Sequence, residues 1–93
     1  MSAGEKFNNL VKIMDRLRGP GGCPWDREQT YASLRSYLLE ESYEVVEALD
    51  SEDLGSLAEE LGDLLLQIVF LSRLGKEDGA FTVEDVIDHI SDK

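Results

Sequence analysis

Residues 54–74 constrain the fold most, because as a helix they would be apolar on two sides. At about 100° per residue, one side carries Leu54, Leu57, Leu61, Leu65 and Ile68, and the roughly opposite side carries Leu66, Phe70 and Leu74. A helix that is apolar all round must be buried all round, and a chain of 93 residues has too few helices to surround one. We therefore expect a homodimer whose interface includes Leu66 and Phe70. The alternative is that the chain is a fragment and that its missing part covers this side.

The rest of the chain also predicts helices. Apolar residues recur at spacings of three and four in each expected helix, over residues 6–17, 29–50, 54–74 and 83–90. The glycines and proline of residues 19–22 end the first helix, and Ser51 and Thr82 are the expected N-caps of the third and fourth. No segment predicts a strand. We expect a single all-α domain over residues 1–93, a helical hairpin with helical flanks that is like a four-helix bundle and is completed by dimerisation.

Composition excludes several classes of partner and site. The chain has 20 acidic and 9 basic residues, a net charge of −11, so binding to nucleic acid or to an anionic membrane surface is disfavoured. Its only cysteine, Cys23, cannot form an intrachain disulfide, and together with its only histidine, His89, cannot build a zinc site. The longest uncharged apolar run, residues 64–71, is too short to span a membrane, and residues 1–10 lack a signal-peptide pattern. We expect a cytoplasmic protein.

Acidic residues are concentrated in the middle of the sequence. Ten of the 20 lie between Glu40 and Asp63, and no Lys or Arg occurs from residue 36 to residue 72. Acidic runs are usually solvated helix faces. Here, however, Glu41 projects about 20° from Leu34, within the apolar arc of its helix, and Glu44 lies near the edge of that arc, at about 80°. These carboxylates are therefore expected to point toward protein.

Four of these carboxylates favour a bound cation. Glu41 and Glu44 lie three residues apart on one predicted helix, as do Glu60 and Asp63 on the next, so an antiparallel hairpin can direct both pairs into one space. Buried carboxylates without a nearby basic residue need a proton, a distant partner or a cation. An all-oxygen set suits Mg²⁺, or alternatively Mn²⁺, better than zinc or copper. Bound Mg²⁺ most often works with substrate phosphates.

Three sequence motifs resemble those of a known family. Residues 40–44, Glu-Glu-Ser-Tyr-Glu, and residues 60–63, Glu-Leu-Gly-Asp, resemble the EExxE and ExxD motifs of the MazG-type all-α nucleoside triphosphate pyrophosphohydrolases. Residues 22–30, which contain Cys23-Pro24-Trp25-Asp26, resemble the GCPWD-x-x-QT stretch of the MazG proteins. The matches run from about residue 10 to residue 93, nearly the whole chain.

The resemblance implies a hydrolase that cleaves nucleoside triphosphates between the α- and β-phosphates, giving a monophosphate and pyrophosphate, with Mg²⁺ required. Carried over by position, the metal ligands would be Glu41, Glu44, Glu60 and Asp63. Glu40 would orient water beside them, so that Glu40 and Glu41 would be the catalytic carboxylates. The alternative is a non-catalytic MazG-like domain that acts as a dimerisation or nucleotide- and metal-binding module.

Substrate-binding residues are suggested near the third motif. Trp25 could stack on a nucleobase, and Arg27 or Arg35 could reach a phosphate. The alternatives are that Trp25 covers the core and that the arginines are surface residues. MazG proteins commonly continue beyond the position of Lys93 into a basic, histidine-containing segment. The chain is therefore also interpretable as the N-terminal piece of a longer protein, with weak activity of its own.

Overall fold

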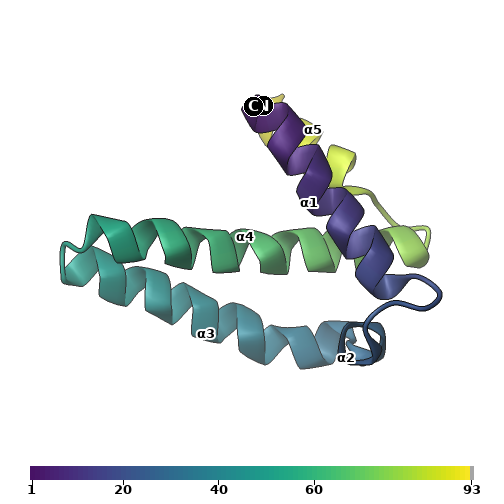
Figure 1. Cartoon of the computed structure of the whole chain (residues 1–93), viewed down its shortest axis with the longest axis horizontal. Helices are drawn as coiled ribbons and strands as arrows, with labels where there is room; N and C mark the ends of the chain where they lie inside the picture. The colour runs from purple at the N-terminus through teal and green to yellow at the C-terminus, as the bar shows by residue number, and fades with distance from the viewer. Residues whose placement is uncertain (93) are drawn as a thin grey trace.

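Five helices make up the fold, in a computed structural model that describes residues 1–92. They are α1 (Ala3–Arg18), α2 (Pro24–Glu28), α3 (Tyr31–Asp50), α4 (Leu54–Glu77) and α5 (Val83–Ser91). The two long helices, α3 and α4, form an antiparallel hairpin; α1 contacts α4 toward its C-terminal end, and α5 follows α4 and projects away from the hairpin (Figure 1). No strand occurs in residues 1–92. The expected all-α hairpin with helical flanks is confirmed.

Side-chain caps set where the helices begin. Thr30 and Thr82 accept hydrogen bonds from the backbone N–H groups three residues later and form capping boxes, which explains the sharp starts of α3 and α5. The expected N-cap at Ser51 is wrong, because Asp53 caps α4 and Ser51 ends α3. Between the first two predicted helices, where the sequence predicted no helix, the structure has the short helix α2, with Pro24 at its first position.

The core lies where α1 crosses the hairpin. Its buried side chains are Met14, Leu34, Val69, Phe70 and Leu74. Phe70 is only 2% exposed, so the prediction that it lies in a dimer interface is wrong. The reason is that α1 folds back over this side of α4 and that the edge of the Trp25 ring also packs against Phe70.

The opposite side of α4 is largely uncovered. Leu61, Leu65 and Ile68 are 48%, 38% and 39% exposed. An apolar stripe on α3, consisting of Leu39, Tyr43, Val46 and Leu49, is also exposed. On each helix, the exposed stripe is rotated in the same sense around the axis from the positions that face the other helix. Because the two helices are antiparallel, this rotation brings both stripes to the same side of the hairpin. One apolar face of the hairpin is therefore open.

Arg18 connects α1 to α2 and α4. Its guanidinium donates hydrogen bonds to the backbone carbonyls of Asp26, Arg27 and Gln29 at the end of α2, and to the Glu77 carboxylate on α4. Its side chain is only 9% exposed. The segment that carries Trp25 is thereby fixed against the hairpin. None of the helices within residues 1–92 is long and apolar enough to cross a membrane.

Candidate metal centre

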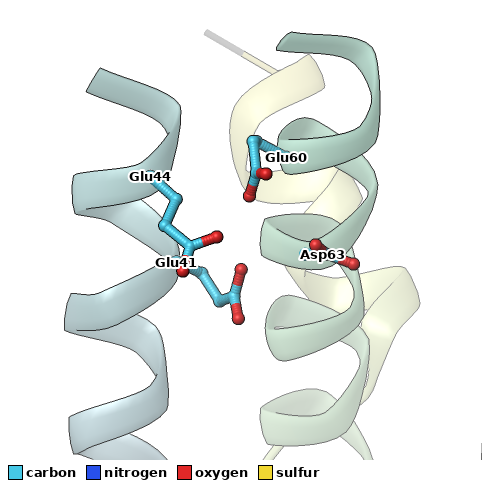
Figure 2. Close-up of side chains that lie close together, drawn as sticks. All are labelled: Glu41, Glu44, Glu60 and Asp63. Carbon is cyan, nitrogen blue, oxygen red and sulfur yellow. The ribbon is translucent and has the colours of Figure 1, made fainter. Parts of the chain in front are cut away.

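Glu41, Glu44, Glu60 and Asp63 meet between α3 and α4. One carboxylate oxygen from each residue lies within 4.8 Å of one from each of the others. Figure 2 shows Glu41 and Glu44 reaching from α3, and Glu60 from α4, into the space between the helices, with Asp63 beside them on α4. The structure thus brings together all four residues that the sequence predicted as metal ligands.

Helix periodicity places these four residues. Glu41 and Glu44 continue the stripe of α3 that contains Leu34 and faces α4, and Glu60 and Asp63 continue the corresponding stripe of α4. Toward one end of the hairpin the facing positions are apolar and form the core. In the middle of the hairpin they are acidic, and beyond them Ala48 on α3 is buried again. The same contact line therefore changes from core to carboxylates within about one helical turn on each helix.

The cluster raises the pKa of its own carboxyl groups. The pKa of Glu60 is raised from 4.5 to about 7, chiefly by a hydrogen bond with Glu44, then by desolvation and by repulsion from the other three carboxylates. The pKa of Glu41 is raised by desolvation and by repulsion from Glu44, Asp63 and Glu40. The site therefore disfavours the fully ionised state in the absence of a cation.

No basic side chain in the described residues 1–92 forms an ion pair with these carboxylates. The ion pairs found within residues 1–92 join Arg18 to Glu77, and Arg73 to Asp15 and Glu77, at the other end of α4. In the same part of the chain, the buried oxygens Glu41 Oε2 and Glu60 Oε2 have no hydrogen-bond partner. Unpartnered anionic oxygens on an all-carboxylate set are the arrangement that a hard divalent cation such as Mg²⁺ fits.

The other predicted site residues lie outside the four-carboxylate cluster. Glu40 precedes Glu41 on α3 and is exposed. Trp25 is 48% exposed, and its ring packs edge-on against Tyr37, with centroids 5.5 Å apart, and against Phe70 at 6.5 Å. Trp25 thus packs against the edge of the core while about half of it stays exposed, an arrangement that is compatible with both interpretations of this residue. Arg27 and Arg35 are exposed surface residues.

Gln67 is a residue near the cluster that the sequence analysis missed. It is 9% exposed, and nothing in the described chain donates a hydrogen bond to its buried Oε1 atom. Seven residues after Glu60 and four after Asp63, it projects between them on the face of α4 that meets α3. The signal was present in the sequence, because Gln67 is the only polar residue in the apolar run 64–71.

Comparison with known proteins agrees with this geometry. The profile of the MazG nucleotide pyrophosphohydrolase domain matches residues 29–93, which include all four clustered carboxylates. The chain belongs to this family. The MazG match begins at the end of α2, so it covers the hairpin and α5.

Several MazG relatives match nearly the whole chain. The chain is 53% identical over 91 residues to the nucleoside triphosphate pyrophosphohydrolase/pyrophosphatase MazG of Thermotoga maritima, covering 98% of the chain and 36% of that protein. It is 49% identical over 89 residues to the nucleoside triphosphate pyrophosphohydrolase of Escherichia coli K12, covering 95% of the chain and 34% of that protein. The corresponding enzyme of Mycobacterium tuberculosis is 47% identical over 92 residues, with 97% and 28% covered. The chain thus spans about a third of the length of these relatives.

Proposed function

We propose that this MazG domain hydrolyses nucleoside triphosphates to a nucleoside monophosphate and pyrophosphate, with Mg²⁺ as cofactor and Mn²⁺ as a possible substitute. The observation that carries the proposal is the cluster of four carboxylates, within 4.8 Å of one another, that has no basic partner in residues 1–92. The names of the Thermotoga and Escherichia relatives support the substrate class and the reaction type.

In this proposal, Glu41, Glu44, Glu60 and Asp63 hold the cation. The bound cation would neutralise phosphate charge and allow so acidic a surface to accept a polyanion. The carboxylates would also accept hydrogen bonds from water and so orient it for attack on the α-phosphorus, and one of them would accept its proton. Glu40, exposed beside Glu41, is the candidate for orienting that water from outside the cluster.

The nucleoside end of the substrate is assigned to the α2 side of the cluster. The reason for this assignment is that Trp25 packs on Tyr37, which lies one turn before Glu41 on α3. A half-exposed indole ring can stack on a nucleobase. Arg27 lies on α2 and Arg35 lies near the start of α3, and both side chains are exposed. We propose that they contact phosphate.

A second copy of the chain is the proposed partner. The open apolar face of the hairpin, formed by the exposed stripes of α3 and α4, is the part of the surface that would become the centre of a four-helix bundle. This replaces the interface predicted from the sequence through Phe70, whose side chain is in the core. Leu61, Leu65 and Ile68 are the residues expected at the centre of the new interface.

The test of the activity is a product analysis of the purified chain with Mg²⁺ and a panel of nucleoside triphosphates. The expected products are monophosphate and pyrophosphate, and in ¹⁸O-water the label should enter the monophosphate, because the proposed attack is on the α-phosphorus. Glu60→Ala and Asp63→Ala should abolish turnover, whereas Cys23→Ser should retain most of it, since no covalent intermediate is proposed. Diphosphate and orthophosphate as first products would contradict the proposal. Metal binding without turnover would instead support the non-catalytic module.

A further inference from the structure

Gln67 has a buried polar atom that the fold does not use. Its side chain is 9% exposed, and its amide oxygen has no hydrogen-bond donor within residues 1–92. A buried acceptor left without a donor destabilises a folded protein. A leucine or methionine at this position would avoid this destabilisation, so the amide needs a reason other than packing.

The position of Gln67 indicates where the missing donor lies. Around the axis of α4, Gln67 projects between the directions of Glu60 and Asp63, and it lies one helical turn after Asp63. This position faces α3 at the boundary between the core and the carboxylate cluster. Toward the core, the contact line between the helices has apolar and aromatic side chains, and none of them donates to this oxygen. The remaining direction for a donor is the carboxylate side.

When a cation is bound, the chemistry of the cluster leaves one type of donor. The four carboxylates that hold a cation are ionised, so they act only as acceptors and cannot donate to an amide oxygen. Mg²⁺ keeps several of its water molecules when it binds to protein carboxylates. A water molecule that hydrates a cation turns its oxygen toward the ion and its two hydrogens outward, so it requires acceptors around it. A neutral, buried amide oxygen one turn from the ligands is such an acceptor.

We propose that Gln67 is a positioning residue of the cation site, and that its Oε1 atom accepts a hydrogen bond from a hydration water of the cation held by Glu41, Glu44, Glu60 and Asp63. The inference rests on the proposed function for the presence of the cation. It adds a fifth polar side chain to the site. Partners of this kind, which contact the ligands or waters of an ion rather than the ion, typically change metal affinity or activity 10- to 100-fold when they are removed.

The experiment compares Mg²⁺ binding by calorimetry, and metal-free melting, in the parent chain and three variants. Gln67→Met keeps the length of the side chain but removes the acceptor, and it should weaken Mg²⁺ binding about tenfold or more. Its metal-free melting temperature should be equal to or higher than that of the parent, because an unsatisfied buried oxygen has been removed. Gln67→Asn, which withdraws the amide by one methylene group, should also weaken binding.

Ser72→Ala is the matched control. Ser72 is 3% exposed on the same helix, but its hydroxyl donates to the carbonyl of Ile68. Its removal should leave Mg²⁺ affinity unchanged. A Gln67→Met dissociation constant within twofold of the parent value would overturn the role of Gln67, while the parent chain would still bind Mg²⁺ and hydrolyse nucleotides. A parent chain that binds Mg²⁺ without turnover would contradict the proposed activity alone, and absence of Mg²⁺ binding would overturn both.

Discussion

The raised pKa of Glu60 predicts a steep dependence of Mg²⁺ affinity on pH. A carboxylate must lose its proton to bind a cation, and the pKa of Glu60 in the metal-free site is about 7. At pH 8 about nine-tenths of the molecules have Glu60 ionised, whereas at pH 6 only about one-tenth do. The apparent dissociation constant should therefore rise about tenfold from pH 8 to pH 6, and about tenfold again by pH 5. The raised pKa of Glu41 acts in the same direction.

Calorimetry at several pH values, in buffers with different ionisation enthalpies, measures both the affinity and the protons released. About 0.9 proton should be released per Mg²⁺ at pH 6 and about 0.1 at pH 8, if Glu60 is the group displaced. Glu60→Gln should bind Mg²⁺ weakly and with a flatter pH profile. Glu59→Gln, at the exposed neighbouring position on α4, is the matched control and should keep the parent profile. A change of less than threefold between pH 8 and pH 6 in the parent would refute the reasoning.

Mg²⁺ affinity is expected to rise with pH, whereas the Glu60 contribution to the stability of the metal-free chain should fall as pH rises. The pKa of Glu60 in the folded state lies above its ordinary value of 4.5, so the favourable contribution of the protonated form is present below about pH 4.5 and is lost as pH rises through 7. The pKa of Glu77 is lowered, mainly by its hydrogen bond with Arg18, so its contribution is present above its ordinary value and is lost on acidification. Thermal melting in chelator should therefore be highest near pH 5, and Mg²⁺ should reverse the decline toward pH 8.

Three further substitutions test other parts of the structure. Arg18→Met should destabilise the fold by about 2–4 kcal/mol, a fall in melting temperature of roughly 10–20 °C, because three backbone carbonyls and Glu77 lose a buried donor. Leu65→Glu should convert the proposed dimer to a folded monomer by light scattering, whereas Ile13→Glu, at a similarly exposed position on α1, should not. Glu41→Gln should melt higher than the parent in chelator but should lose most of the stabilisation by Mg²⁺, and an unchanged Mg²⁺ shift would contradict its assignment as a ligand.

The hairpin and its carboxylates could be predicted from the sequence because both follow from helix periodicity. The positions of Glu41 and Glu44 relative to Leu34 require only the rotation per residue, and an antiparallel connection through residues 51–53 then sets them opposite Glu60 and Asp63. These relations are local in the sequence, apart from one short turn. No long-range packing needs to be known.

The side of α4 that forms the core could not be predicted in the same way. Both sides of this helix are apolar, so the choice between them depends on where α1 packs, which is a contact between segments some 55 residues apart, such as Met14 and Val69. The sequence predicted that Phe70 lies in a dimer interface, and the structure buries Phe70 in the core of the single chain. The hydrogen bonds of Arg18 are a similar case. Their carbonyl acceptors lie at the end of the short helix α2, which the sequence did not predict because it follows a Gly- and Pro-rich segment.

The contact line between α3 and α4 joins the stability of the fold to the site. Its apolar positions form the core, and its four carboxylates would oppose helix association if every one were ionised and no cation were bound. The chain does not relieve this repulsion with a lysine or arginine, since none occurs from residue 36 to residue 72. Instead, a proton on Glu60, whose pKa is about 7, reduces the repulsion. At neutral pH the cluster can exchange that proton for a cation. A basic residue placed here would stabilise the metal-free hairpin, but it would occupy the space and cancel the charge that the cation requires.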